Sequence, residues 1–392
     1  MKRYIILIIS VIIFKLPVFS QSKIENVLAE IEQNNTTLSA LRKSADAEKI
    51  GNKSGIYLQN PEVEFNYLWG NPSMIGNRTD VRVTQSFDFP SAYKYKNQIS
   101  ENKNEQTELE YLKQKKELLY EARVICNQLI YQNALISELA KRVDHAEQIS
   151  KAYKTKLDAG ESNILDYNKA ELNLLNSGKE LESVKVERSF SLSELARLNS
   201  GIEIEFDDSG FPLVQIPTNF EQWYQEAKQN NPLLAWLKQE IEISQNREKL
   251  NRAMSLPKLQ TGYMSEKTTE EHFQGVTVGV SIPLWENKNT VKYAESQTMA
   301  LQSIEADNQL QFYNRLKTLH KKAINLQNNV SDYAEKLDYL NSTDLLKKAL
   351  DKGQISLIEY MLELSIYYES INKMLDLQLD LQNSLTELYK YK

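Results

Sequence analysis

Residues 157–167 read LDAGESNILDY, and residues 350–360 repeat this stretch as LDKGQISLIEY. Leu, Asp, Gly, an acidic residue and Tyr occupy the same places in both copies. In each copy a long helical pattern runs into the Gly and a second helical pattern leaves it. Glycine suits a helix C-terminus because it adopts the left-handed backbone conformation without steric cost. Each stretch therefore predicts the tip of a long helical hairpin, at Gly160 and at Gly353.

The two tips belong to a duplication that covers the chain. Residues 24–58 resemble residues 220–254, and their alignment places Asn34 on Asn230 and Pro61 on Pro257. We therefore predict two structural repeats, residues 21–200 and residues 219–392, each with a helix, a β-hairpin, a long helix, a tip and a return helix. Residues 201–218 contain two prolines, and we expect them to form an ordered connector between the repeats with room for one small strand.

After Pro61 and Pro257 the spacing of apolar residues changes from helical to every second residue. Val63 and Phe65 show this alternation in the first repeat, and Val276 and Val278 show it in the second. Residues 61–89 and 257–285 therefore each predict a β-hairpin with one apolar face.

Two interpretations of these strands are open. They form either a small sheet over a soluble core or the lipid-facing part of a transmembrane barrel, and no spare apolar element is left to cover a soluble sheet. Trp69 at one end and Phe89 and Trp285 at the other suit the aromatic girdles of a barrel at the membrane interfaces. Bacterial barrels have at least about eight strands, so four per chain require an oligomer.

The helical patterns are long and heptad-like. Residues 95–157 would form a helix of roughly 90 Å at about 1.5 Å per residue. Their apolar positions, such as Leu118, Ala122, Ile125 and Leu129, step by fours and threes. This spacing indicates coiled-coil packing rather than a globular core.

The N-terminus has the features of a signal peptide. Lys2 and Arg3 precede an apolar run at residues 4–14, and Ser20 precedes the expected cleavage site. We predict that residues 1–20 are removed; the alternative, an uncleaved anchor, needs a longer apolar run. The net charge of −6 argues against binding to nucleic acid. The single cysteine, Cys126, excludes an internal disulfide, and the sequence assigns it no role.

The sequence lacks the patterns that an enzyme would need. His145, His272 and His320 are scattered, with no partner at metal-ligand spacing. There is no glycine-rich phosphate loop and no nucleophile elbow. We therefore expect no catalysis, no cofactor and no metal site.

The order of elements, given twice after a signal peptide, resembles the TolC-type outer-membrane efflux channels. The segment NNPLLAWLKQEIEISQNREKLNRAMSLPKL at residues 230–259, the strand ends QSFDFP and VSIPLW, and the two tips carry this resemblance. It implies a mainly α fold with transmembrane β, in which long coiled-coil helices form a periplasmic tunnel. Four strands per chain would contribute to a trimeric, twelve-stranded β-barrel.

The resemblance implies an outer-membrane channel of a tripartite efflux system. Such a homotrimer is a passive exit duct that lies in outer-membrane lipid and extends its helices into the periplasm. Its substrates come from an inner-membrane pump of RND or ABC type through a periplasmic adaptor, a membrane fusion protein. The alternative is a soluble periplasmic coiled-coil scaffold or adaptor. The sequence does not distinguish metal ions, drugs and proteins as cargo.

The resemblance also assigns roles to residues at the tips. Adaptor docking falls on Leu157, Gly160, Leu350 and Gly353, and the periplasmic gate falls on Asp166 and Glu359. The family's next acid has Leu362 in its place here. The alternative for the two acids is a structural one, either a solvated helix face or an acid in the first turn of the return helix that the helix dipole favours. Both interpretations stay open at this point.

Overall fold

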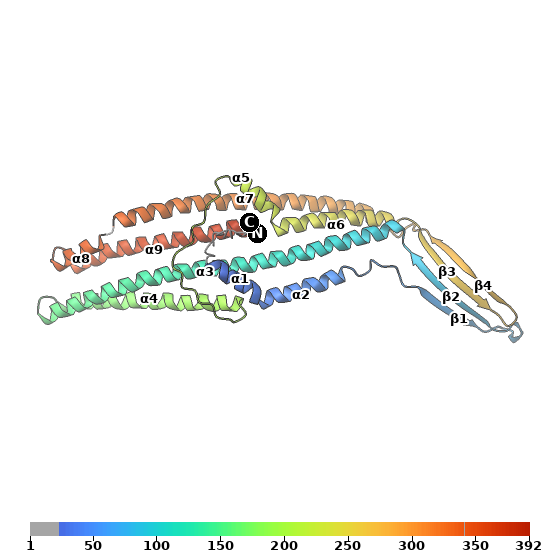
Figure 1. Cartoon of the computed structure of the whole chain (residues 1–392), viewed down its shortest axis with the longest axis horizontal. Helices are drawn as coiled ribbons and strands as arrows, with labels where there is room; N and C mark the ends of the chain where they lie inside the picture. Colours follow the sequence, from blue (N-terminus) through green and yellow to red (C-terminus); the bar gives the residue numbers. More distant parts are fainter. Residues whose placement is uncertain (1–22, 341) are drawn as a thin grey trace, which may run out of the picture. The chain divides into compact units, whose positions relative to one another are not determined.

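The computed structural model describes residues 23–340 and 342–392, so the predicted signal peptide at residues 1–20 lies outside the described residues. The predicted combination of long helices with four strands is confirmed (Figure 1). The described chain forms two compact units. The tip unit contains residues 23–35, 121–214 and 328–383, and the sheet unit contains residues 36–120, 215–327 and 384–392. Each unit thus combines segments of both sequence repeats.

The sheet unit is built around one antiparallel sheet of four strands in the order β1-β2-β3-β4. The strands are β1 (Glu62–Leu68), β2 (Arg78–Phe87), β3 (Lys258–Lys267) and β4 (His272–Ser281). The central pair, β2 with β3, joins the hairpins of the two repeats, with Val83 opposite Tyr263. Among the residues that the structure describes, β1 and β4 each pair on one side only, so this sheet has two open edges.

The two faces of this sheet differ in polarity. One face carries apolar side chains that stay exposed, and Val278, at 77% exposure, is typical. The pairing places Phe65 opposite Val81 on this face. The other face carries ion pairs, such as Arg78 with Glu266 at 2.9 Å and Arg82 with Glu64 at 3.4 Å. The alternation that the sequence predicts thus separates an exposed apolar face from a charged one.

Two of the shorter helices of the sheet unit begin at asparagine caps, at Asn219 and Asn231. Helix α2 covers Thr36–Gly51, α5 covers Phe220–Gln229 and α6 covers Pro232–Met254. At the start of α6 the Asn231 side chain accepts the backbone N–H of Leu233 at 2.9 Å, and Pro232 follows, where it loses no hydrogen bond. Two long helices, α3 (Pro90–Asp158) and α7 (Thr290–Tyr339), begin in this unit directly after the sheet.

The tip unit is a bundle of helices. It contains α1 (Lys23–Asn34), α4 (Ile164–Leu198), α8 (Thr343–Asp351), most of α9 (Leu357–Leu388) and the later parts of α3 and α7. Helix α3 packs between α4 and α9, where Leu139, Val184 and Leu375 share a core. The two hairpins differ in one respect: α3 reaches its tip without a break, whereas α7 ends at Tyr339 and α8 begins at Thr343.

Residues 201–218 form no helix or strand, and hydrogen bonds fix their backbone in both units. In the tip unit Asn133 donates to the carbonyl of Asp208 at 2.8 Å and Arg188 donates to that of Phe206 at 2.9 Å. In the sheet unit Tyr389 donates to the carbonyl of Gln215 at 2.6 Å. The connector is therefore ordered, although the small strand that the sequence allowed is not formed.

Cys126 is fully buried in α3, and burial raises the pKa of its thiol to about 12. Since the thiolate is the reactive form of cysteine, this thiol is inert at neutral pH. Within residues 23–340 and 342–392, none of the helices is long and apolar enough to cross a membrane.

Candidate functional site

The first tip is closed by a glycine turn of the Schellman type. Helix α3 ends at Asp158, and Gly160 follows with a φ of +71°. The backbone N–H of Gly160 donates to the carbonyl of Leu157 at 3.0 Å, and that of Glu161 donates to the carbonyl of Lys156 at 2.7 Å. This pair of bonds defines the motif and satisfies the last carbonyls of the helix.

The second tip repeats this turn. Gly353 has a φ of +67°, and its backbone N–H donates to the carbonyl of Leu350 at 3.0 Å. The N–H of Gln354 donates to the carbonyl of Ala349 at 2.8 Å. The left-handed backbone at both glycines explains why the sequence keeps Gly at these two places.

The two predicted gate acids lie in the first turn of the return helices, where each takes part in a cap. At α4 the Asn163 side chain accepts the backbone N–H of Asp166 at 3.0 Å. At α9 the N–H of Glu359 donates to the Ser356 hydroxyl at 3.3 Å, and the N–H of Ser356 donates to the Glu359 carboxylate at 2.7 Å. The second arrangement is a capping box, and its S-x-x-E pattern at residues 356–359 can be read in the sequence. Our sequence reasoning missed it.

The two acids differ in how their charge is balanced. The Asp166 carboxylate accepts hydrogen bonds from Lys169 at 3.1 Å and from Asn163 at 2.9 Å. Leu362 occupies the place of Lys169 in the second repeat, so no such ammonium is available to Glu359. The backbone N–H of Ser356, followed by its hydroxyl, lowers the pKa of Glu359. The carboxylate of Glu359 is therefore exposed and charged, and it lacks the lysine three positions later that Asp166 has.

The two tips pack against each other within the tip unit. Leu350, Leu357 and Tyr360 of the second hairpin share a core with Ile149 and Tyr153 of the first. Leu350 is only 6% exposed, whereas its counterpart Leu157 is half-buried. The two leucines that the sequence assigns to one role therefore have different environments.

The exposed surface of the tips combines the glycine turns with apolar side chains. Gly160 and Gly353 are both exposed, and a Cβ added to either glycine would meet no atom within 4 Å. On α9, Ile358, Leu362 and Ile366 are each more than half exposed and are spaced by four residues. This spacing places them in one stripe along the helix.

The three predicted interface aromatics lie at the ends of the sheet. Trp69 directly follows β1, where β1 turns into β2, and it makes an edge contact with Tyr67 at 5.6 Å between ring centroids. Phe89 and Trp285 lie at the opposite end, next to the starts of α3 and α7. All three side chains are exposed.

The histidines lie on separate elements and bind different neighbours. The imidazole of His145 is 3.1 Å from the Tyr368 hydroxyl, and that of His320 is 2.7 Å from the carbonyl of Pro217. Among the described residues, no three His, Cys, Asp or Glu side chains are placed to hold a metal ion together.

Solved structures of membrane proteins are similar to this chain over nearly its full length. CusC, whose structures concern folding and transmembrane channel formation, aligns with a TM-score of 0.77 and 16% identity over 95% of this chain and 92% of its own. For the CmeC outer membrane channel of Campylobacter jejuni the TM-score is 0.71 and the identity 12%, over 94% and 85% of the two chains. The MtrE outer membrane channel of Neisseria gonorrhoeae, in its open state, aligns with a TM-score of 0.68 and 11% identity. This alignment covers 94% of this chain and 88% of the MtrE chain.

The chain has the fold of these outer-membrane channels. The predicted TolC-type fold is thereby confirmed, on similarity of structure rather than of sequence. No family model matches the sequence, and no curated protein matches it.

Proposed function

We propose that the chain is the outer-membrane channel of a tripartite export system, a passive exit duct that performs no chemistry. The four-stranded sheet carries this proposal, because its apolar face is exposed and both of its edges are open. An exposed apolar face of this kind requires a partner or a lipid environment. The channel fold of the solved structures supports the same proposal.

The proposal includes a homotrimer. Open edges of strands are sites for pairing with another chain, so β4 of one protomer can add to β1 of the next. Three copies of four strands give a closed barrel with its apolar face toward outer-membrane lipid and its charged face toward the lumen. A soluble coiled-coil scaffold, the alternative, would leave this apolar face without a function.

Bilayer recordings test the duct. Full-length protein purified in detergent should be trimeric and should give single-channel conductance in planar bilayers. Val278→Arg places a charge on the apolar face of β4, which costs about 2–4 kcal/mol at mid-membrane, so this variant should fail to assemble in outer membranes. Thr277→Arg, on the opposite face, is the matched control. A soluble monomer without detergent, or normal assembly of Val278→Arg, would contradict the proposal.

We further propose that the tips dock a periplasmic adaptor, which connects the duct to an inner-membrane pump of RND or ABC type. The exposed turns at Gly160 and Gly353 and the half-buried Leu157 are the proposed contact residues. Leu350 does not contact the adaptor in this proposal; it packs in the tip core and holds the exposed turn in place. Crosslinking from cysteines placed at Glu161 and Gln354 should capture the adaptor, whereas a cysteine at exposed Glu182 should not.

For the periplasmic gate we propose different roles for Glu359 and Asp166. Glu359 is the stronger candidate for an acid that faces permeating ions, because its carboxylate is exposed and has no counterpart of Lys169. The negative charge of Asp166 is already balanced by its ion pair with Lys169. The two interpretations of the sequence are compatible at Glu359, since a capping carboxylate keeps its charge and one free oxygen.

A further inference from the structure

Two short apolar segments flank the sheet at the same end, one beside each open edge. Residues 56–58, Ile-Tyr-Leu, precede β1, and we call them the pre-β1 segment. Residues 282–284, Ile-Pro-Leu, follow β4, and we call them the post-β4 segment. Because neighbouring strands are antiparallel, β1 begins and β4 ends at the same end of the sheet, where α3 and α7 start (Figure 1).

The apolar side chains of both segments are exposed in the single chain. Tyr57 and Leu58 of the pre-β1 segment, and Ile282 and Leu284 of the post-β4 segment, are each more than half exposed. Exposed apolar side chains that gather beside an unpaired strand edge mark a surface that another molecule covers.

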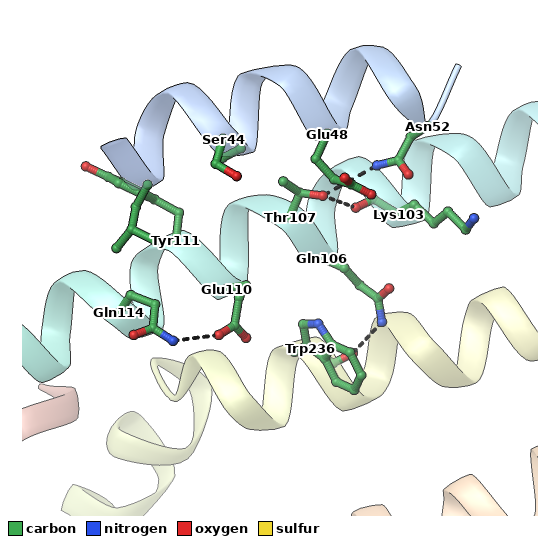
Figure 2. Close-up of a pocket in the computed structure, with 12 residues that line it drawn as sticks. Ser44, Glu48, Asn52, Lys103, Gln106, Thr107, Glu110, Tyr111, Gln114 and Trp236 are labelled. Atoms are coloured by element: carbon green, nitrogen blue, oxygen red, sulfur yellow. Dashed lines mark hydrogen bonds between the residues drawn. The ribbon is translucent and has the colours of Figure 1, made fainter. Parts of the chain in front are cut away.

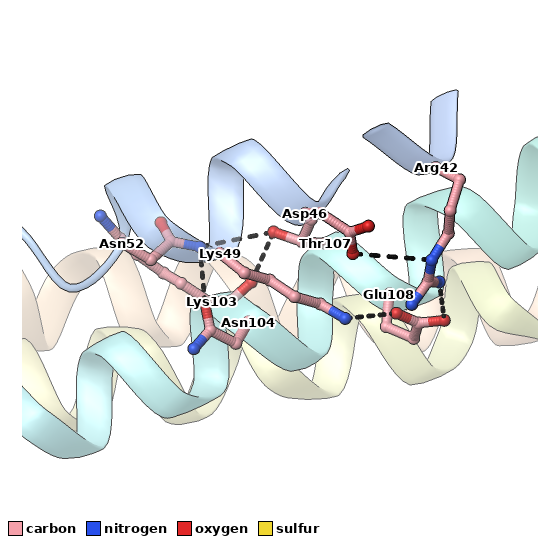
Figure 3. A network of polar contacts seen from close by, with 8 residues as sticks. All are labelled: Arg42, Asp46, Lys49, Asn52, Lys103, Asn104, Thr107 and Glu108. Atoms are coloured by element: carbon pink, nitrogen blue, oxygen red, sulfur yellow. Dashed lines mark hydrogen bonds and ion pairs between the residues drawn. The ribbon is translucent and has the colours of Figure 1, made fainter. Parts of the chain in front are cut away.

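Hydrogen bonds fix the chain on both sides of the pre-β1 segment. On one side, Asn52 at the end of α2 donates to the Thr107 hydroxyl of α3 at 3.4 Å (Figure 2) and to the Asn104 side chain at 3.1 Å (Figure 3). On the other side, the Gln85 side chain of β2 donates to the carbonyl of Gln59 at 2.7 Å. The segment is therefore held next to the sheet.

The pre-β1 segment nevertheless stays outside the hydrogen-bonded ladder. The pairing of β1 with β2 ends at Glu62, opposite Thr84, although β2 continues to Phe87. Pro61 precedes Glu62 and has no backbone N–H to continue the pairing. The segment thus adds its apolar side chains to the open edge of β1.

The post-β4 segment is also fixed on both sides. Before it, Ser281 pairs with Lys258 of β3 at the end of the ladder. After it, the Asn287 side chain donates to the carbonyl of Met254, the last residue of α6, at 2.7 Å. Both open edges therefore end in a held segment with exposed apolar side chains.

We propose that the pre-β1 segment of one protomer packs against the post-β4 segment of the next, as an apolar clasp between two copies of the chain. This inference rests on the proposed homotrimer. When β4 of one protomer adds to β1 of the next, the two segments become neighbours, because each continues from its strand at the same end of the sheet. The contact is heterologous, and repeating it three times closes a ring.

The clasp also selects which edges pair. Backbone hydrogen bonds alone would allow the β1 edges of two copies to pair with each other. In an antiparallel pair of that kind the two pre-β1 segments would lie at opposite ends and could not meet. Only the pairing of β4 with β1 brings apolar segments together, so the clasp favours the ring over a two-fold dimer.

Cysteine crosslinking of the full-length protein tests the clasp. Cys126 is buried and unreactive, so engineered cysteines can be addressed alone. With a short bismaleimide, Leu58→Cys combined with Leu284→Cys should give covalent trimers on a denaturing gel. Leu58→Cys combined with Met74→Cys is the matched control, because Met74 is equally accessible but lies at the opposite end of the sheet. This pair should give no covalent trimer.

Exchange of charges gives a second readout. Leu58→Lys and Leu284→Glu should each weaken the trimer about tenfold, measured as the dissociation constant in detergent, and the combined variant should recover most of this loss. Both positions are exposed in the single chain, so the fold of the protomer should be unchanged. A combined variant as weak as the product of the two single variants would overturn the clasp.

The unmodified chain separates the two ways in which the inference can fail. A monomer in detergent would contradict the proposed homotrimer itself. Trimers that form and conduct, but give no crosslink in the double cysteine variant, would overturn the clasp alone. Quenching by brominated lipid of a dye on Leu58→Cys in such trimers would then assign the pre-β1 segment to the membrane.

Discussion

At the first tip Asp166 is paired with Lys169, whereas at the second tip Glu359 has Leu362 in the corresponding place. The backbone turns at Gly160 and Gly353 are otherwise alike in φ and in hydrogen bonding. The comparison teaches that the turn and its surroundings are separable: the backbone needs only glycine, while the neighbouring side chains are free to differ. It also predicts which substitutions should affect the two tips unequally.

The largest difference should come from the two leucines before the turns. Leu350→Ala removes a buried side chain from the tip core and should cost about 2–5 kcal/mol of stability. Leu157→Ala removes a half-buried one and should cost clearly less. Thermal unfolding of the purified variants compares the two. Equal losses would show that the tip core in the assembled protein differs from the one described.

Valine at either glycine should be the next largest effect. Gly353→Val and Gly160→Val force a β-branched residue into the left-handed region, at a cost of about 1–3 kcal/mol. We expect trimers to form, but export by living cells to be lost because the docking turn is disturbed. Gly178→Val, in the middle of α4 with open space around it, is the control that keeps the turns intact. Normal export by Gly353→Val would argue against docking at that turn.

Exchanging the residue three positions after each acid should make the tips alike. Leu362→Lys gives Glu359 the partner that Asp166 has, and Lys169→Leu removes that partner from Asp166. In bilayer recordings we expect Leu362→Lys to weaken block of the pore by divalent cations about as much as Glu359→Gln does. Asp166→Asn should change block little. Identical block in Leu362→Lys and in the unmodified channel would remove Glu359 from the lumen.

The smallest expected effect is a dependence of the second cap on pH. The pKa of Glu359 is lowered from its ordinary value of 4.5. The charged carboxylate therefore stabilises the cap at any pH above 4.5, and this contribution is lost as the pH falls through the lowered pKa. Amide hydrogen exchange in the first turn of α9 should therefore be steady from neutral pH to about pH 5, after correction for intrinsic rates, and should become relatively faster in acid. In Glu359→Gln this dependence should be absent.

The sequence predicted the tips well because their determinants are local. A glycine between two long helical patterns marks a helix end, because it adopts the left-handed conformation there, so Gly160 and Gly353 could be located from the residues on either side. The strands could also be predicted from the sequence, because alternating apolar and polar residues place their side chains on opposite faces of a sheet. The fold followed from the order of these local patterns.

Other features depend on which helices become neighbours, and the sequence could not show that. Leu157 and Leu350 match in the repeat, yet only Leu350 is buried, because α9 and α3 meet there. In the sheet unit, Glu48 of α2, Glu110 of α3 and Trp236 of α6 line one surface pocket although they come from three separate helices. Its residues have no spacing that a motif search would detect.

The pairing of β2 with β3 has a consequence for how the chain folds. Phe87 ends one strand and Lys258 begins the other, so the central pair of the sheet closes a loop that includes the rest of the first repeat, the connector and the first helices of the second repeat. Closing so large a loop costs conformational entropy before any contact in the pair is gained, and contacts of this range slow folding. Until β3 has been synthesised, β2 has only β1 as a partner. The sheet therefore cannot be completed until the first helical hairpin, α3 with α4, has been synthesised, and that hairpin has time to form before the sheet does.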